Sequence, residues 1–220
     1  MNTNSAIQET RQKLLDAAGE IFAEQGFHRA TTRDICNRAG ANAAAINYHF
    51  RDKEGLYLEV LKHLVRVAFE KYPPLGGLPP EAPAPQRLRA FIRSWLLRLV
   101  GHGMASWHGQ LVAREMAEPS SVSNAVIGKA VSDHAQKLRD LVREILGTDA
   151  TDELVRDATY SIAGQCLFYF HGRQMIRRMS PELKFSDEDI EHLANHIARF
   201  TLGGLRAGAK GHAARGLGNF

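Results

Sequence analysis

The chain is poor in the residues and segments that mark several whole classes of protein. Among its 220 residues are only two cysteines, Cys36 and Cys166, which lie far apart without paired spacing. Neither a disulfide framework nor a cysteine-based zinc site is indicated. The longest apolar runs fall well short of the roughly 20 residues that cross a bilayer. The polar N-terminus has no apolar signal-peptide core, so we expect a cytoplasmic protein with no membrane partner.

Sequence signatures of common enzymes are missing as well. The chain contains no GxSxG, Walker-type loop, HExxH or dinucleotide fingerprint, so we expect no enzyme activity and no cofactor. Its formal net charge is only +4, with Lys and Arg spread along the whole chain. That charge is compatible with a nucleic-acid partner, but it is too small for strong sequence-blind binding to DNA.

What the chain does contain is helical periodicity almost throughout. Apolar residues recur at helical spacing, and no sustained period-two stretch occurs, so the predicted fold class is all-α. Most of the prolines fall in Tyr72–Gln86, which cannot continue a helix and is predicted to be an extended connector. The Gly/Ala-rich, basic tail is expected to be disordered.

The predicted helices follow from stop and cap residues. Before the connector they cover 8–25, 32–39, 43–50 and a segment that begins after Asp52. After the connector they cover 86–102, 106–117, 120–146, 151–179 and 186–205. Gly26 and Gly40 are predicted to end the first and the second of these helices.

The most informative stretch is Thr31–Lys53. Thr31 can accept a hydrogen bond from the amide of Asp34 and so begin a helix of about eight residues that ends at Gly40. A short turn leads to a second helix with three consecutive alanines, whose small side chains let a backbone approach the major groove, about 12 Å wide. Ile46 and Phe50 are expected to anchor its inner face. Two short helices joined in this way predict a helix-turn-helix.

The N-terminal segment resembles the TetR family of bacterial transcriptional regulators. The resemblance rests on RQKLLDAAGEIFAEQGFHRATTRDI, the AG turn and the closing YHFRDKEGLYLEVL. It implies a three-helix DNA-binding domain over residues 8–68, a connector over 69–86, a helical-bundle domain for effector binding and dimerisation over 87–205, and a tail over 206–220. NAAAINYHF and the phrase from Arg114 to Ser120 resemble the CecR-like subgroup.

The resemblance assigns DNA-contact roles to particular positions. Thr31, Thr32 and Arg33 would contact backbone phosphate at the start of the first helix. The residues facing base edges would be Asn42, Ala43, Ala44 and Ala45. Tyr48, His49 and Lys53 would hold flanking phosphates. Asn42, Ala44 and Asn47 depart from the usual family pattern, and because Asn can read adenine bidentately, Asn42 or Asn47 is a candidate base reader.

The C-terminal part is expected to bind an unknown small molecule and to form a homodimer through its last two long helices. A two-fold dimer would place two recognition helices about 34–36 Å apart on an inverted-repeat operator. Repression, with release by the effector, is the family's usual behaviour. The candidate pocket residues are aromatic, apolar or polar side chains at helical spacing: Trp95, Leu99, Met104, Trp107, Arg114, Gln165, Phe168, Tyr169 and His171.

Plainer interpretations stand beside these. An aromatic stripe is more often ordinary core, and Arg114 with Glu115 forms a buried polar pair, a ligand clamp or an exposed pair. Cys36 is most simply a small buried hydrophobe. A metal-responsive regulator is the alternative function, because Glu188, His192 and His196 recur at every fourth position on one helical face. A solvated or interface face is the simpler interpretation of that spacing.

Overall fold

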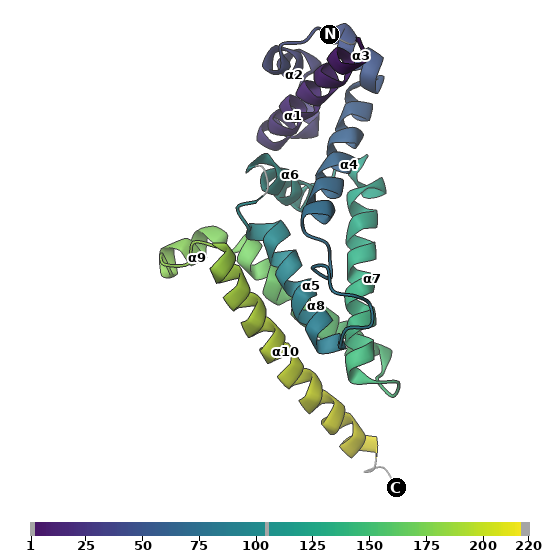
Figure 1. Ribbon diagram of the computed structural model, residues 1–220, viewed down its shortest axis with the longest axis vertical. Coiled ribbons are helices and arrows are strands. Elements are labelled where there is room, and N and C mark those ends of the chain that lie inside the picture. The colour runs from purple at the N-terminus through teal and green to yellow at the C-terminus, as the bar shows by residue number, and fades with distance from the viewer. Residues whose placement is uncertain (1–2, 104–105, 217–220) are drawn as a thin grey trace. The chain divides into compact units, whose positions relative to one another are not determined.

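The structure is a computed structural model that describes residues 3–103 and 106–216, with side chains described for residues 5–103 and 106–207. Within these ranges every regular element is a helix, as the sequence predicts (Figure 1). The elements are α1 (Thr3–Arg29), α2 (Thr32–Ala39), α3 (Ala43–Phe50), α4 (Lys53–Lys71), α5 (Ala84–Val100), α6 (Ser106–Ala117), the short 3-10 helix η1 (Ser123–Ala125), α7 (Ile127–Leu146), α8 (Asp152–His171), α9 (Arg173–Met179) and α10 (Asp187–Gly216).

The chain folds into two compact units, each with its own apolar core. The N-terminal unit holds the residues up to Ala68 and also the segment that ends at Ala130, which contains α6 and η1. The C-terminal unit holds Phe69–Gly103 and the chain from Val131 onward. The N-terminal unit therefore contains a helix from the middle of the sequence, beyond the connector.

The core of the N-terminal unit forms around the long helix α1. Leu14, Ala18 and Phe22 of α1 are fully buried, and α2, α3 and α4 contribute further apolar side chains to the same cluster. The fully buried rings of Phe22 and Tyr57 lie in this core at a ring separation of 4.5 Å, and the partly buried ring of Phe27 packs on Tyr57 at 4.9 Å. Gly26 has a φ of 79°, so the predicted stop is a kink after which the last helical residues continue in a new direction.

Helix α6 packs against α1 through a close approach at Gly19. An added Cβ at Gly19 would lie 2.7 Å from the indole of Trp107, whose own side chain is buried in the N-terminal core. Arg114 donates from Nε to the carbonyl of Ala23 at 3.3 Å and from Nη2 to the carbonyl of Glu24 at 3.2 Å. These two carbonyls lie just before the kink at Gly26, where the regular helical conformation is interrupted.

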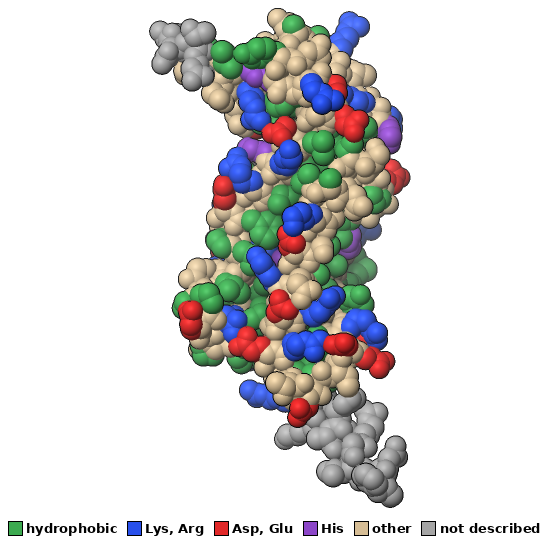
Figure 2. Space-filling model, turned by 90° about the vertical axis from the view of Figure 1, so that its right-hand side faces the viewer, with side chains coloured by type: hydrophobic (Ala, Val, Ile, Leu, Met, Phe, Trp, Pro, Cys, Tyr) green, Lys and Arg blue, Asp and Glu red, His purple; other side chains and the backbone are tan. Residues whose placement is uncertain are grey.

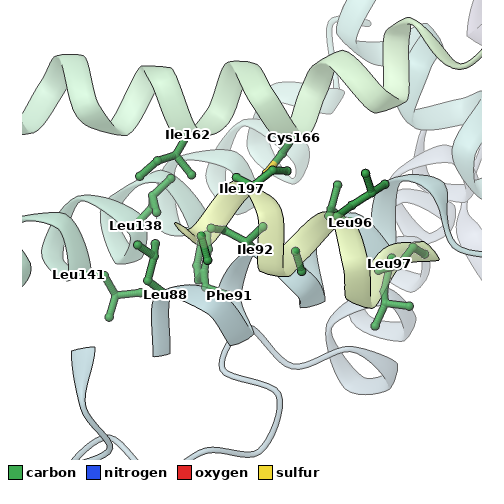
Figure 3. Packing of buried hydrophobic residues seen from close by; sticks show 14 of the residues in the cluster. Leu88, Phe91, Ile92, Leu96, Leu97, Leu138, Leu141, Ile162, Cys166 and Ile197 are labelled. Carbon is green, nitrogen blue, oxygen red and sulfur yellow. The ribbon is translucent and has the colours of Figure 1, made fainter. Parts of the chain in front are cut away.

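The core of the C-terminal unit is built mainly from α5, α8 and α10 together with the later part of α7. Leu88, Phe91 and Ile92 of α5 pack with Leu138 of α7, and Ile162 and Cys166 of α8 and Ile197 of α10 lie in the same cluster (Figure 3). The pairing of α5 with α10 is also polar, because Arg89 and Arg93 both form ion pairs with Glu191.

Several predicted helices differ in extent from those observed, and α1 covers Thr3–Arg29 where 8–25 is predicted. The segment predicted over 151–179 is divided at Gly172 into α8 and α9. The segment predicted over 120–146 begins with η1 before α7 starts at Ile127. Helix α10 continues to Gly216, into the part of the chain that composition alone predicts to be disordered.

The irregular part of the proline-rich connector is shorter than expected, because α4 continues to Lys71 and α5 begins at Ala84. Turns follow one another through it, and Gly76 and Gly77 have positive φ values of 59° and 86° that favour glycine. The Ser94 hydroxyl donates to the carbonyls of Tyr72 at 2.9 Å and Pro73 at 2.5 Å. Side chains of α5 therefore hold the start of the connector. No helix in the described ranges is long and apolar enough to cross a membrane.

Candidate nucleic-acid interface

Two short capped helices, α2 and α3, form the helix-turn-helix. The Thr31 hydroxyl accepts from the Asp34 amide at 3.1 Å and donates to the Asp34 carboxylate at 2.6 Å, which fixes the start of α2. Gly40 ends this helix in the left-handed conformation, with φ 64° and ψ 33°. Its neighbour Ala41 donates to the carbonyl of Cys36 at 3.0 Å. The turn therefore has the geometry that the sequence predicts.

The inner faces of both helices are anchored in the N-terminal core. Ile35 and Cys36 of α2 and Ile46 and Phe50 of α3 are all buried. Burial of the Cys36 thiol raises its pKa, as expected for a small buried hydrophobe rather than a reactive thiolate. Because the helices are fixed from within, their outer side chains keep a defined position.

The outer face of α3 is open to solvent. Ala43, Ala44 and Asn47 are exposed, and 75% of the Tyr48 surface is accessible. Ala45, predicted to lie on this face, is half-buried and packs against the core. The small exposed alanines leave the backbone of α3 accessible, and Asn47 is the exposed amide in the middle of the helix. This face has the shape and chemistry needed to read base edges in a major groove.

Asn42 has a structural role in α3 that Asn47 does not share. Its side-chain oxygen accepts from the Ala45 amide at 3.0 Å, so it is the N-cap of α3. The amide nitrogen of Asn42 can still donate, but bidentate reading of adenine also needs the oxygen. The structure therefore favours Asn47 over Asn42 as the candidate bidentate reader.

The candidate phosphate-binding residues border α2 and α3. Arg33 is exposed, whereas Thr32 and His49 are half-buried. The Lys53 ammonium donates to the carbonyls of Phe27 at 2.9 Å and Ala30 at 3.0 Å and lies 4.7 Å from the Phe27 ring centre. Two of its three protons are therefore used within the protein, and one is left for an external acceptor.

Arg51 is a candidate that the sequence interpretation omitted. It directly follows α3, its side chain is 92% exposed, and its φ of 76° is in a region that non-glycine residues rarely adopt. A basic residue immediately after a recognition helix is the signal that could have identified it. An exposed guanidinium at this position is suited to a phosphate beside the groove.

Comparison with known protein families gives one match to the helix-turn-helix segment and another to the C-terminal part of the chain. Residues 14–60 match the family described as "Bacterial regulatory proteins, tetR family". Residues 84–205, more than half of the chain, match "HTH-type transcriptional dual regulator CecR, C-terminal domain". The chain belongs to the TetR family. As a TetR-family protein with a CecR-type C-terminal domain, it is a DNA-binding transcriptional regulator and not an enzyme.

Relatives of this TetR-family regulator include the HTH-type transcriptional dual regulator CecR of Shigella flexneri. It is 29% identical over 192 residues, which cover 84% of this chain and 86% of the relative. Among solved structures, the fatty acid degradation regulator FadR from Bacillus halodurans has a TM-score of 0.63 at 19% identity, over 90% of this chain and 96% of that one. AibR, solved with isovaleryl coenzyme A and operator DNA, has a TM-score of 0.62 at 16% identity, over 86% and 96%. The two structures support the fold.

The candidate effector residues of this regulator fall in several places instead of one. Trp107 and Arg114 belong to the N-terminal unit, where they pack against α1, and Met104 lies outside the described residues. Trp95 and Leu99 pack on the C-terminal core. A further group on α8, Gln165, Phe168 and Tyr169, lines a groove of about 290 Å³ with Gly164 and two residues of α10, His196 and Ile197. His171 is exposed at the end of α8.

Arg114 and Glu115 do not form a pair of any of the three kinds that the sequence left open, because each has separate partners. Arg114 donates to two carbonyls of α1, whereas Glu115 is only 5% exposed and accepts from the Tyr57 hydroxyl. Its second oxygen accepts from the Ser120 amide at 3.0 Å and hydroxyl at 3.2 Å. Burial and the adjacent carboxylate raise the pKa of Tyr57. Glu115 therefore ties α6 to α4 inside the N-terminal unit.

The metal-responsive alternative is not supported. Glu188, His192 and His196 are exposed on α10. Within the described part of the chain, no three His, Cys, Asp or Glu side chains come together in a way that could hold a metal ion. The His196 ring instead lies 6.4 Å from the Phe200 ring in a stacked arrangement.

Proposed function

We propose that this regulator is a homodimeric repressor that binds an inverted-repeat operator and leaves it when a small molecule binds the C-terminal unit. The observation that carries the proposal is the exposed outer face of α3, held by buried Ile46 and Phe50 and presenting Asn47 one turn after the small exposed alanines Ala43 and Ala44. Asn47 is the base reader, and Arg33, Tyr48 and Arg51 position the helix through phosphates.

Mixed surface charge argues for sequence-specific binding over electrostatic binding alone. On the face drawn in Figure 2, Lys and Arg side chains lie interspersed with Asp and Glu. Arg38, for example, pairs with Glu20 at 2.7 Å and lies 3.4 Å from Glu24. With little excess positive charge, sequence-independent affinity should be modest, and discrimination between sites must come from the groove contacts of α3.

The dimer is supported by the outward faces of α8 and α10. One face of each helix enters the core through Ile162, Cys166 and Ile197 (Figure 3). Large apolar side chains of the same two helices are exposed to solvent. Tyr160 is 62% exposed, Phe168 51% and Phe200 68%. Exposed aromatic groups of this size, gathered on two helices, are typical of protein interfaces.

Glycines on the same helices allow a partner to come close. A Cβ added at Gly164 of α8, or at Gly203 or Gly204 of α10, would meet no atom within 4 Å. These positions are therefore open on the outside and present bare backbone. Two helices from each of two copies would make a four-helix interface, and the two-fold axis would repeat the recognition helix on the DNA.

Release from the operator on effector binding follows from thermodynamic linkage. A ligand that binds better to a conformer with the wrong spacing of recognition helices weakens operator binding by the same free energy. AibR, whose structure contains both isovaleryl coenzyme A and operator DNA, is a precedent for such a pair of ligands on this fold.

The test is selection of bound fragments from a random duplex pool by the full-length protein at moderate salt. We expect an enriched inverted repeat with half-sites about one helical turn apart. Asn47→Ala should lose affinity for the selected site by about 1–3 kcal/mol and relax the preference at one base position in each half-site. Asn37→Ala, an exposed asparagine on α2 outside the proposed contact face, is the matched control and should bind as the parent does.

Three results would each contradict part of the proposal. A selected motif without inverted symmetry, together with a monomeric mass in solution, would exclude the dimer. Equal losses in Asn47→Ala and Asn37→Ala would exclude α3 as the reading helix. A reporter placed behind the selected operator gives the sign of regulation, and higher expression with the protein than without it would exclude repression.

A further inference from the structure

A polar cluster inside the C-terminal unit is centred on two residues that were not among the predicted effector residues, although Trp95 beside them was. It consists of Arg98 on α5 and His134 on α7, with the aromatic rings of Phe69, Phe91 and Trp95 around them. His134 follows the helical spacing of the buried residues Leu138 and Leu141, which is the sequence signal that marks it as a core position.

Arg98 differs from the other arginines on its helix. Arg87 pairs with Glu144, and Arg89 and Arg93 pair with Glu191. Arg98 instead donates to the carbonyl of Tyr72 and to the Ser94 hydroxyl at 2.9 Å, both neutral acceptors.

The charge of Arg98 is held without an anion. Its guanidinium carbon lies 4.5 Å from the centre of the Phe69 ring, and no carboxylate among the described residues of the C-terminal unit forms an ion pair with it. Burial lowers the pKa of Arg98 to about 10, which still leaves it charged at neutral pH. A largely buried cation without a counter-charge is costly, so an anion placed beside it would be stabilised.

His134 contributes a hydrogen-bond donor without an acceptor. Its Nδ1 lies 3.5 Å from an Arg98 nitrogen, and because a guanidinium only donates, Nδ1 is the acceptor. The proton is then on Nε2, which is buried and has no hydrogen-bond partner. Burial, together with the charges of Arg98 and Lys137, lowers the pKa of His134 to about 3, so the ring is neutral at physiological pH.

The surroundings of this donor are aromatic. The His134 ring stacks on Phe91 at 4.3 Å with an interplanar angle of 21°, and Trp95 meets it edge-on at 4.4 Å. Phe69 lies on a third side at 6.1 Å. Such rings favour a flat apolar ligand body, while the two polar groups require one negative charge and at least one further acceptor atom.

We propose that Arg98 and His134 bind the carboxylate of a small aromatic acid, which is the effector of this regulator. The assignment rests on the proposed effector-controlled function. A carboxylate supplies both missing features in one group, because it carries a single negative charge and two acceptor oxygens. A phosphate dianion would bring more charge than one guanidinium balances. Since Arg98 also holds the Tyr72 carbonyl, an acid that draws the guanidinium away changes the start of the connector.

The experiment measures binding of benzoate, phenylacetate and 1-naphthoate to the full-length protein by calorimetry and by the shift in melting temperature. Each acid is compared with its primary amide, which has the same shape without the charge. We expect at least one acid to bind at least about tenfold more tightly than its amide, the equivalent of one charge-assisted hydrogen bond. Equal binding of acid and amide, or no binding of any acid at millimolar concentration, overturns the proposal.

Variants assign the binding to this cluster. Arg98→Gln should weaken the best acid by about tenfold or more, and Arg98→Lys, which keeps the charge, by less. His134→Phe keeps the ring but removes the N–H donor and should also weaken binding, so the proposal stays testable if Arg98→Gln does not fold. Lys137→Gln, one turn from His134, removes a nearby charge and is the matched control. If Lys137→Gln weakens binding as much as Arg98→Gln, the cluster is not the site.

Failure of this proposal is distinguishable from failure of the proposed function. Operator binding by the unmodified protein without any acid tests the function, and the calorimetry does not depend on DNA. A specific operator with no acid bound overturns the ligand assignment alone. Acid binding that needs Arg98, in a protein that selects no operator, supports the ligand assignment and contradicts the repressor.

Discussion

The packing of α6 against α1 predicts that the effect of Gly19→Ala on the free energy of unfolding changes sign when Trp107 is replaced. Gly19 lies in α1 beneath the Trp107 indole, and a Cβ there would lie 2.7 Å from three ring atoms. Replacing a helical glycine by alanine ordinarily stabilises a protein by about 1 kcal/mol. Overpacking a rigid ring costs about 1–3 kcal/mol. Gly19→Ala should therefore lower the free energy of unfolding by up to about 2 kcal/mol.

In a Trp107→Leu background the clash is removed. That substitution is itself destabilising, because it leaves space in the core, but adding Gly19→Ala should then raise the free energy of unfolding by up to about 1 kcal/mol. The coupling between the two sites is expected to be about 1–3 kcal/mol. Gly109→Ala is the matched control: no atom lies within 4 Å of its added Cβ, so it should stabilise both backgrounds equally.

The assay is urea unfolding followed by circular dichroism, at one fixed protein concentration because a dimer's stability depends on concentration. If Gly19→Ala has the same sign and size in both backgrounds, Trp107 is not packed on α1. The sequence-based placement of Trp107 in an effector cavity would then be the better one.

Three further predictions concern buried or strained groups. Burial lowers the pKa of His134 to about 3 and of His108 to about 4, so below pH about 6.5 the unfolded chain binds more protons than the folded one. The free energy of unfolding should therefore fall as the pH drops through 6 toward 4. The melting temperature should depend less steeply on pH in His134→Phe over that range, and an unchanged slope would contradict this. Arg51→Gly should relieve the positive φ and stabilise the protein by up to about 1 kcal/mol in urea unfolding, whereas Arg51→Ala should not. Glu115→Gln keeps one acceptor oxygen but puts an NH2 donor in place of the other, so it loses either the Tyr57 bond or the Ser120 bonds and should cost about 1–3 kcal/mol in the same assay; a neutral result would show that the carboxylate is dispensable.

The sequence alone determined the features that depend on local chemistry. Thr31, Gly40 and Asn42 act within three or four residues of chain, through caps and one left-handed turn, so the bounds of α2 and α3 could be predicted. The exposed and buried sides of α3 followed from helical periodicity for the same reason, apart from half-buried Ala45 and His49. The family resemblance rested on this segment.

Only the tertiary structure decided which distant residues meet. Trp107 and Trp95 look alike at helical spacing, yet one packs on Gly19 of α1 and the other on His134 of α7. Periodicity shows that a side chain faces inward but not which core it enters, because that depends on how helices far apart in sequence pack. The missing acceptor of His134 is likewise a property of the folded interior, where a polar atom loses water and its partner must come from another element.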